Sequence, residues 1–236
     1  MENSERFLNA FASIEKHLKK ICNFDTWTGF SPAVKEASKT LPAVRRFRDD
    51  LMEFAELRNA IVHNGGAGYV IAEPNSKAVT RIEQILDVIT NPPKVIPAFQ
   101  VDVLTFDTNM PIAKVLESMA NKSISQVPIT DNNKFKALLT TDTITRWLGL
   151  NVKEDIISLS ECPIGEVLKY SESFDNFKFL SKKTTLFETM ESFHVFENQG
   201  KRMDAVLITE TGKSNETIIG IVTVADFPKM IRIIGI

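Results

Sequence analysis

The sequence predicts an α+β protein, in which a four-helix bundle over about residues 1–91 is followed by two copies of a mixed strand–helix unit. Three observations lead to this expectation. Before Asn91, apolar residues recur at the three- and four-residue steps of helices. After Pro93, short β-rich runs alternate with amphipathic stretches. The second part of the chain also repeats itself, and its insertions fall where loops are expected.

Four helices are expected in the first part of the chain. The apolar face of the first is formed by Phe7, Phe11, Ile14, Leu18 and Ile21. A short helix follows Ser31-Pro32, with Ser31 as its N-cap. A long helix runs from about Pro42 to His63 and ends at Asn64-Gly65-Gly66, because glycine accepts the left-handed conformation. Glu73-Pro74 opens the last helix, which ends at Asn91-Pro92-Pro93.

The second part predicts six strands and the helices between them. Strands are expected at 101–106, 126–130, 136–141, 177–181, 204–209 and 218–224, and amphipathic helices at 111–120 and 186–196. Ile112 aligns with Leu186, Pro128 with Leu207 and Leu138 with Ile221, so the offset grows from 74 to 79 and then to 83 residues. We therefore expect repeats at about 94–150 and 160–236.

The composition is that of an ordinary globular protein, with 236 residues, 43% of them hydrophobic, and a net charge of −2. This charge gives no electrostatic case for broad binding to nucleic acid or to an anionic membrane. The N-terminus is charged from residue 2, unlike a signal peptide, and the apolar runs are too short to span a bilayer. We expect a cytoplasmic protein without a membrane partner.

The two cysteines, Cys22 and Cys162, lie far apart in the sequence and lack the spacing of metal ligands. We interpret them as buried thiols in a reducing compartment, and no metal site is expected. The glycine patterns of P-loop and Rossmann nucleotide sites are also missing from the sequence. Any nucleotide site in this chain must therefore be of another type.

Each repeat contains a hydrophobic strand, a turn, a second strand and then a Thr-containing helix start. The first copy reads SQVPITDNNKFKALLTTDTITRWL and the second reads DAVLITETGKSNETIIGIVTVADFPKMI. This arrangement resembles a tandem pair of CBS domains, a Bateman module, over about residues 94–236. The resemblance implies that clefts between the copies bind an adenosine nucleotide, and that modules pair as homodimers.

The side chains of the family's T-x-x-D motif can form hydrogen bonds with a nucleotide. In the second copy, the hydroxyl of Thr223 can donate to a phosphate near the amides of a helix N-terminus, and Asp226 can accept from ribose hydroxyls. In the first copy, Thr140 is followed by Thr143 where aspartate is expected, and Asp142 stands one position early. We therefore expect one complete ribose site and one impaired site.

The resemblance assigns further cleft positions by alignment. The backbone that would face adenine belongs to Ser125, Gln126 and Val127 in the first copy and to Asp204, Ala205 and Val206 in the second. The cations that would neutralise a di- or triphosphate are Lys182, Lys183, Lys201 and Arg202. The alternative is that these cations are solvated loop residues, and that Thr223 and Asp226 form an ordinary N-cap.

Arg58, Asn59 and His63 lie at the end of the long helix. Asn59 and His63 are four residues apart and share a helix face, and Arg58 is long enough to reach the same space. The pattern resembles the Arg-polar-x-x-x-His signature of HEPN domains, over about residues 1–91. Many of these helical bundles are metal-independent ribonucleases, and they usually act as dimers. The alternative is that Arg58 and Asn59 pair with neighbouring helices, and that His63 interacts with the helix dipole.

As a ribonuclease site, His63 would move a proton from a ribose 2′-hydroxyl and Arg58 would stabilise the phosphorane. Our main expectation is instead a regulatory sensor, in which the CBS pair binds AMP, ADP, ATP or S-adenosylmethionine and controls a HEPN-like effector, with no required cofactor. Two alternatives stay open. One is a metal-independent endoribonuclease gated by the module, with RNA bound at the N-terminal domain. The other is a dimerisation or scaffold protein with empty clefts. Whether the chain is an enzyme stays open.

Overall fold

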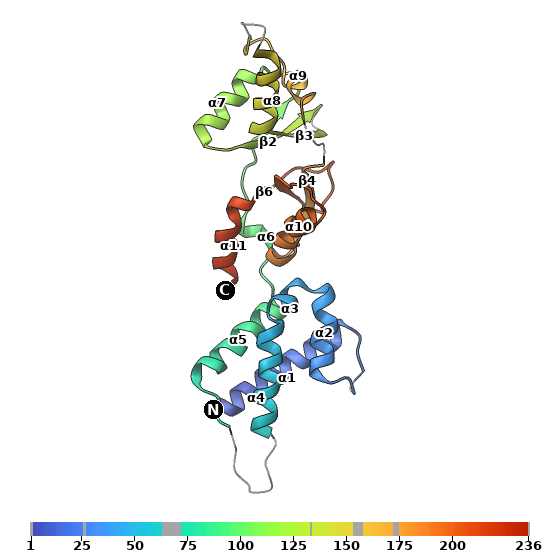
Figure 1. Ribbon diagram of the computed structural model, residues 1–236, viewed down its shortest axis with the longest axis vertical. Helices are drawn as coiled ribbons and strands as arrows, with labels where there is room; N and C mark the ends of the chain where they lie inside the picture. The colour runs from blue at the N-terminus through green and yellow to red at the C-terminus, as the bar shows by residue number, and fades with distance from the viewer. Residues whose placement is uncertain are drawn as a thin grey trace. The chain divides into compact units, whose positions relative to one another are not determined.

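The computed structural model describes residues 2–25, 27–62, 72–132, 134–152, 158–171 and 175–235. The chain divides into two compact units, Met1–Pro93 and Lys94–Ile236. The first unit is helical and the second mixes helices with strands (Figure 1), so the α+β expectation is confirmed. Within the described ranges, no helix combines the length and apolar character needed to cross a bilayer.

The described part of the first unit contains five helices. They are α1 (Asn3–Ile21), α2 (Phe30–Thr40), α3 (Pro42–Arg46), α4 (Arg48–Val62) and α5 (Ser76–Thr90). The predicted apolar face of α1 is buried except for Ile21, which is 44% exposed. Phe7 meets Phe54 of α4 edge-on at 5.6 Å between ring centroids, and Phe11 lies 4.1 Å from Phe30 of α2. These aromatic contacts hold α2 and α4 against α1.

The structure corrects two predicted helix boundaries. Helix α2 begins at Phe30, whose ring packs against Phe11 in the core. Gly29 is therefore the N-cap, and Ser31, the predicted N-cap, lies inside the helix. The long predicted helix is divided at Phe47, whose backbone (φ −103°, ψ 16°) leaves helical geometry while its ring is buried. His63 and the predicted stop at residues 64–66 lie outside the described residues.

The second unit contains two three-stranded sheets with the same order of elements. The first repeat consists of β1 (Phe106–Asp107), α7 (Ile112–Lys122), β2 (Gln126–Asp131), β3 (Lys134–Thr140) and α8 (Thr141–Asn151). The second consists of β4 (Phe177–Ser181), α10 (Leu186–Asn198), β5 (Ala205–Thr209), β6 (Gly220–Val222), the 3₁₀ turn η2 (Val224–Asp226) and α11 (Phe227–Ile234). In each sheet the middle strand pairs in parallel with the first strand and antiparallel with the third.

The strand predicted over 101–106 is mostly absent, because this segment pairs with the other repeat. It follows a short helix, α6 (Val95–Ala98). The N–H of Val101 donates to the carbonyl of Ile219 at 3.1 Å, and Gln100 forms an antiparallel bridge with Gly220. Lys229 of α11 donates to the carbonyl of Ala98 at 2.8 Å. Residues 95–101, which the prediction included in the first repeat, thus precede its first strand and complete the second repeat.

The converse holds for the segment that follows the first repeat. Helix α9 (Ile164–Leu168) falls inside the range predicted for the second repeat, 160–236, but its apolar side chains belong to the core of the first repeat, with Ile112 and Trp147. The N–H of Ile112 donates to the carbonyl of Cys162 at 2.9 Å. Each repeat is therefore closed by a segment that precedes the other repeat in the sequence.

The two sheets pack through an apolar layer between β3 and the second sheet. Leu138, Ala205 and Leu207 form its buried centre. The ring of Phe135 meets the rings of Phe177 and Phe179 edge-on, with centroid distances of 4.8 and 5.0 Å. This packing brings the N-terminus of α8, at the end of β3, close to the residues that precede β5.

Both cysteines are free thiols. They are half-buried, whereas the sequence analysis predicted that they would be buried. Burial raises the pKa of the Cys22 thiol and of the Cys162 thiol, because an uncharged thiol tolerates removal from water better than a thiolate does. Both groups are therefore weak nucleophiles at neutral pH.

Candidate functional site

A cleft of about 370 Å³ opens in the second unit, where the N-terminus of α8 faces the segments that precede β4 and β5. Its volume lies in the range of small-molecule sites, about 300–1,000 Å³. It is lined by Thr140, Asp142, Thr143, Arg146, Asp175, Asn176, Gly200, Lys201, Arg202 and Asp204. Because these residues come from both repeats, one ligand in the cleft would contact both.

The first repeat contributes a capped helix start to the cleft. Thr140 is the N-cap of α8, and its hydroxyl accepts from the backbone N–H of Thr143 at 3.2 Å. The hydroxyls of Thr140 and Thr143 lie 3.1 Å apart, and both residues are buried. The helix N-terminus adds a partial positive charge at this edge of the cleft.

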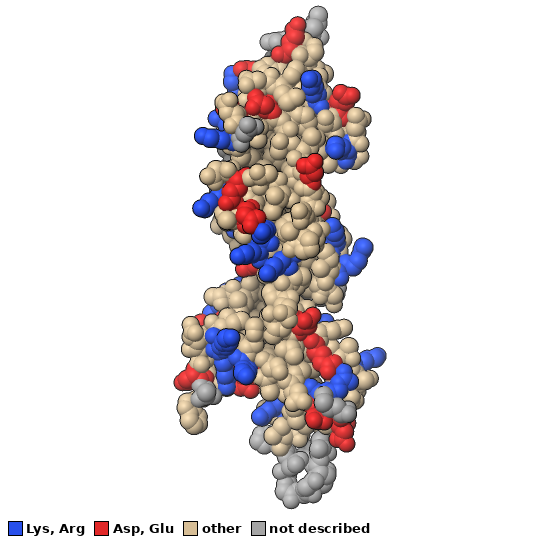
Figure 2. Space-filling view, turned by 180° about the vertical axis from the view of Figure 1, so that it is seen from behind, with Lys and Arg blue, Asp and Glu red and all other residues tan. Residues whose placement is uncertain are grey.

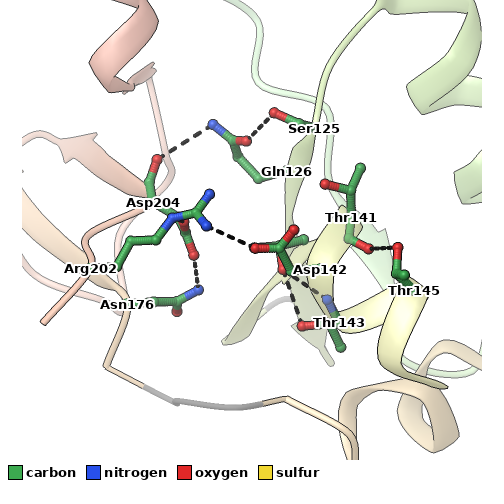
Figure 3. Close-up of polar contacts among 10 residues, drawn as sticks. Ser125, Gln126, Thr141, Asp142, Thr143, Thr145, Asn176, Arg202 and Asp204 are labelled. Atoms are coloured by element: carbon green, nitrogen blue, oxygen red, sulfur yellow. Dashed lines mark hydrogen bonds and ion pairs between the residues drawn. The ribbon is translucent and has the colours of Figure 1, made fainter. Parts of the chain in front are cut away.

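The second repeat contributes an arginine that reaches across the cleft (Figure 3). Arg202 donates through Nη1 to Asp142 at 2.9 Å and pairs through Nε with Asp204 at 2.9 Å. Asn176 donates through Nδ2 to the other carboxylate oxygen of Asp204 at 2.7 Å. The two repeats are thus joined by a polar network at the cleft.

The formal charges of the lining residues balance. Asp142, Asp175 and Asp204 are opposed by Arg146, Lys201 and Arg202, and Lys201 pairs with Asp175 at 2.7 Å. Carboxylates accept hydrogen bonds from hydroxyl groups, and the guanidinium and ammonium groups donate to anions. The cleft therefore offers partners both to a polyhydroxylated group and to an anionic group.

Two predicted positions from different copies meet in the structure. Gln126, which opens β2, donates through Nε2 to the backbone carbonyl of Asp204 at 3.5 Å and accepts from the hydroxyl of Ser125 at 2.6 Å. Val127, Ala205 and Val206 lie in the middle strands, and their side chains are fully or almost fully buried. Of the predicted binding residues, those at the cleft are Thr140, Thr143, Lys201, Arg202 and Asp204.

Thr223 and Asp226 form hydrogen bonds with each other. The backbone N–H of Thr223 donates to Oδ2 of Asp226 at 2.9 Å, and the Thr223 hydroxyl lies 3.2 Å from the same oxygen. Neither residue lines the cleft described above, and neither does Lys182, which pairs with Glu210. The sequence predicts the motif of the second copy as the complete ribose site, whereas the motif that lines this cleft is Thr140–Thr143 of the first copy.

Sequence reasoning missed Asp142, Arg146, Asp175, Asn176 and Gly200. Asp142 was expected to face away from the site because it stands one position early, but it lines the cleft and pairs with Arg202. A signal for Asn176 was present, since Asn176 and Asp204 each stand directly before a strand, and β4 and β5 pair in parallel with Phe177 opposite Ala205. The starts of adjacent parallel strands lie at the same edge of a sheet, so the two side chains are neighbours. Arg146 lies one helical turn beyond Thr143 in α8.

In the first unit, Arg58 and Asn59 lie near the end of α4. Nη1 of Arg58 donates to Oδ1 of Asn59 at 3.3 Å, and Arg58 is half-buried. The third member of the predicted constellation, His63, lies outside the described residues.

On the face seen in Figure 2, acidic and basic side chains form small mixed groups, and uncharged surface lies between these groups. Basic residues do not gather there into a continuous stripe. This distribution agrees with the net charge of −2.

The family model of the CBS domain matches residues 87–150. No curated protein matches the sequence. Among solved structures, the CBS domain pair of protein MJ0100, in complex with 5′-methylthioadenosine and S-adenosyl-L-methionine, is 15% identical, with a TM-score of 0.45 over 60% of this chain and 97% of its own. CbpB in complex with c-di-AMP is 13% identical, with a TM-score of 0.44 over 64% of this chain and 91% of its own. A conserved protein from Pyrococcus horikoshii is 14% identical, with a TM-score of 0.43 over 60% of this chain and 93% of its own.

Proposed function

We propose that this chain is a regulatory sensor of an adenine nucleotide or a related adenosyl ligand, with residues 94–236 acting as a tandem CBS pair. The observation that carries the proposal is the cleft lined from both repeats, which combines hydroxyls, carboxylates and cations in about 370 Å³. The CBS family match over residues 87–150 supports the proposal for the first repeat.

The chemistry of the cleft suggests how such a ligand would lie. Asp175 and Asp204 offer carboxylate oxygens to the ribose hydroxyls, and Arg202 and Lys201 offer donors to a phosphate near the N-terminus of α8. Because the ligand would contact both repeats, its binding would favour one arrangement of the two over another. A ligand shifts such an equilibrium only by its difference in affinity for the two states.

The proposal predicts that adenosyl ligands stabilise the full chain against thermal unfolding. A panel of AMP, ADP, ATP, S-adenosylmethionine and c-di-AMP should contain at least one ligand that raises the stability by about 2.7 kcal/mol at 100 times its Kd. Asp204→Asn should remove most of this effect, because the carboxylate lies in the cleft and is only 14% exposed.

Two further variants locate the site. Asp131→Asn makes the same change at the opposite end of the β2–β3 hairpin from Thr140 and should leave binding unchanged. Asp226→Asn tests the second copy. If Asp226→Asn alone abolishes binding, the ligand lies at the second copy and the proposed cleft is wrong. If no ligand of the panel stabilises the chain, the proposal that it is a sensor of adenosyl ligands is wrong.

For the first unit, we propose a HEPN-like effector domain that the sensor regulates, within a homodimer. In this proposal the helical domain acts by docking and not by catalysis. Coupling between the ligand and this output requires two states of the chain that bind the ligand with different affinity.

We expect purified protein not to cleave single-stranded RNA in the presence of EDTA, with or without the ligand found in the panel. The readout is gel electrophoresis of end-labelled RNA. Metal-independent cleavage that Arg58→Ala abolishes would instead make the chain a ribonuclease, and Lys39→Ala, which removes an exposed cation from α2, serves as the matched control.

A further inference from the structure

Arg202 is held unequally by its two carboxylate partners. Asp204 is 14% exposed and is bound both by Nε of Arg202 and by Asn176. The side chain of Asp142 is 60% exposed, and within the described part of the chain Arg202 is its one polar partner. The Nε contact is therefore the fixed one, and the Nη1 contact with Asp142 is the exposed one.

The exposed contact is weak enough to be exchanged. The side chain of Arg202 is 76% exposed, and ion pairs between exposed side chains contribute only about 0–1 kcal/mol. A guanidinium carries five donors in a rigid fork, so the group can remain bound to Asp204 through Nε while its outer nitrogens change partner. A phosphate group accepts two such donors at once and competes well with a single carboxylate oxygen.

We propose that Arg202 is the anion receptor of the cleft, and that Asp142 occupies this receptor until an anionic ligand displaces it. Asp142 is then an internal competitor that weakens the binding of anionic ligands and thereby sets the affinity of the site. The proposal rests on the proposed function and adds a residue whose removal strengthens binding.

The position of Asp142 accounts for its role. It lies in the first turn of α8, one residue before the Thr143 that stands in place of the family aspartate. Thr143 is buried and bonded to Thr140, whereas Asp142 extends into the cleft toward Arg202 (Figure 3). The shift by one residue turns a carboxylate that would accept from ribose into one that pairs with the opposite repeat.

Isothermal titration of the full chain with AMP and with adenosine tests this proposal. Asp142→Asn keeps the shape of the side chain and removes the competing charge, so the Kd for AMP should fall about fivefold, the equivalent of one exposed ion pair. Adenosine has no anionic group, and its Kd should not change. Arg202→Ala should raise the Kd for AMP about tenfold.

The double variant separates this role from a direct contact. If Asp142 acts through Arg202, then Asp142→Asn in the Arg202→Ala background should change the Kd for AMP by less than a factor of two. Asp131→Asn, the matched control, should have no effect in either background.

Each contrary outcome is specific. Weaker AMP binding by Asp142→Asn would make Asp142 a direct ligand and overturn the proposal, and so would an unchanged Kd or an equal gain for adenosine. If AMP binds to the wild-type chain, these results refute only the competitor role. If neither AMP nor adenosine binds to the wild-type chain or to Asp142→Asn, the inference fails, and failure of the whole ligand panel shows that the sensor proposal fails too.

Discussion

Replacing Gly220 with alanine should destabilise the second unit by about 1–3 kcal/mol, the usual cost of forcing an extra group into a packed site. A Cβ atom on Gly220 would lie 2.6 Å from the backbone carbonyl oxygen of Phe99. This oxygen is a backbone atom, so it cannot rotate away as the end of a side chain would. The clash would push apart the segments that are joined by the Gln100–Gly220 bridge.

Urea unfolding followed by circular dichroism measures this effect, and Gly149→Ala is the matched control. Gly149 lies in α8, and a Cβ there would have no atom within 4 Å. Alanine at this position should stabilise the helix by about 0.5–1 kcal/mol. Equal effects of the two substitutions, or a neutral Gly220→Ala, would show that the segment around Phe99 does not pack on β6.

Truncating Ile164 to alanine should cost about 2–5 kcal/mol, the range observed for large-to-small changes in cores. Ile164 is fully buried, and its side chain packs in the core of the first repeat. The loss should appear as a lower urea midpoint in the fluorescence of Trp147, which is 4% exposed and belongs to the same core. The other tryptophan, Trp27, is 91% exposed and should contribute little to the change.

Leu150→Ala removes a comparable apolar side chain from the surface of α8, where it is 66% exposed, and should change the stability by less than about 0.5 kcal/mol. If Ile164→Ala behaved like Leu150→Ala, helix α9 would not be part of this core.

The sequence predicted best what depends on neighbouring residues. The spacing of Phe7, Phe11, Ile14 and Leu18 correctly gave the buried face of α1, because helical periodicity is a local property. The order of strands and helices in each repeat was also readable. The division at Phe47 was not, since it depends on where a ring finds space in a core built from other helices.

In the site, too, positions within one motif could be predicted from the sequence, whereas contacts between distant segments could not. The motif positions Thr140 and Thr143 were recognised by spacing, and both lie at the cleft. That Arg202 would reach Asp142 depends on how the two sheets pack through Phe135 and its aromatic neighbours, which a linear pattern does not encode. The same packing places this cleft beside Thr140. The contact of Asp226 with Thr223 is instead local, three residues apart in the sequence.

The exchange of short segments between the repeats has a consequence for the order of folding. The first repeat is complete once residues up to Leu168 have left the ribosome, because α9 supplies its missing core. The second repeat needs both ends of the unit, and the contact between Lys229 and Ala98 spans 131 positions. Closing so long a loop is entropically costly and slow. The first repeat should therefore fold early in synthesis, and the second only once residues up to Lys229 of α11 have left the ribosome.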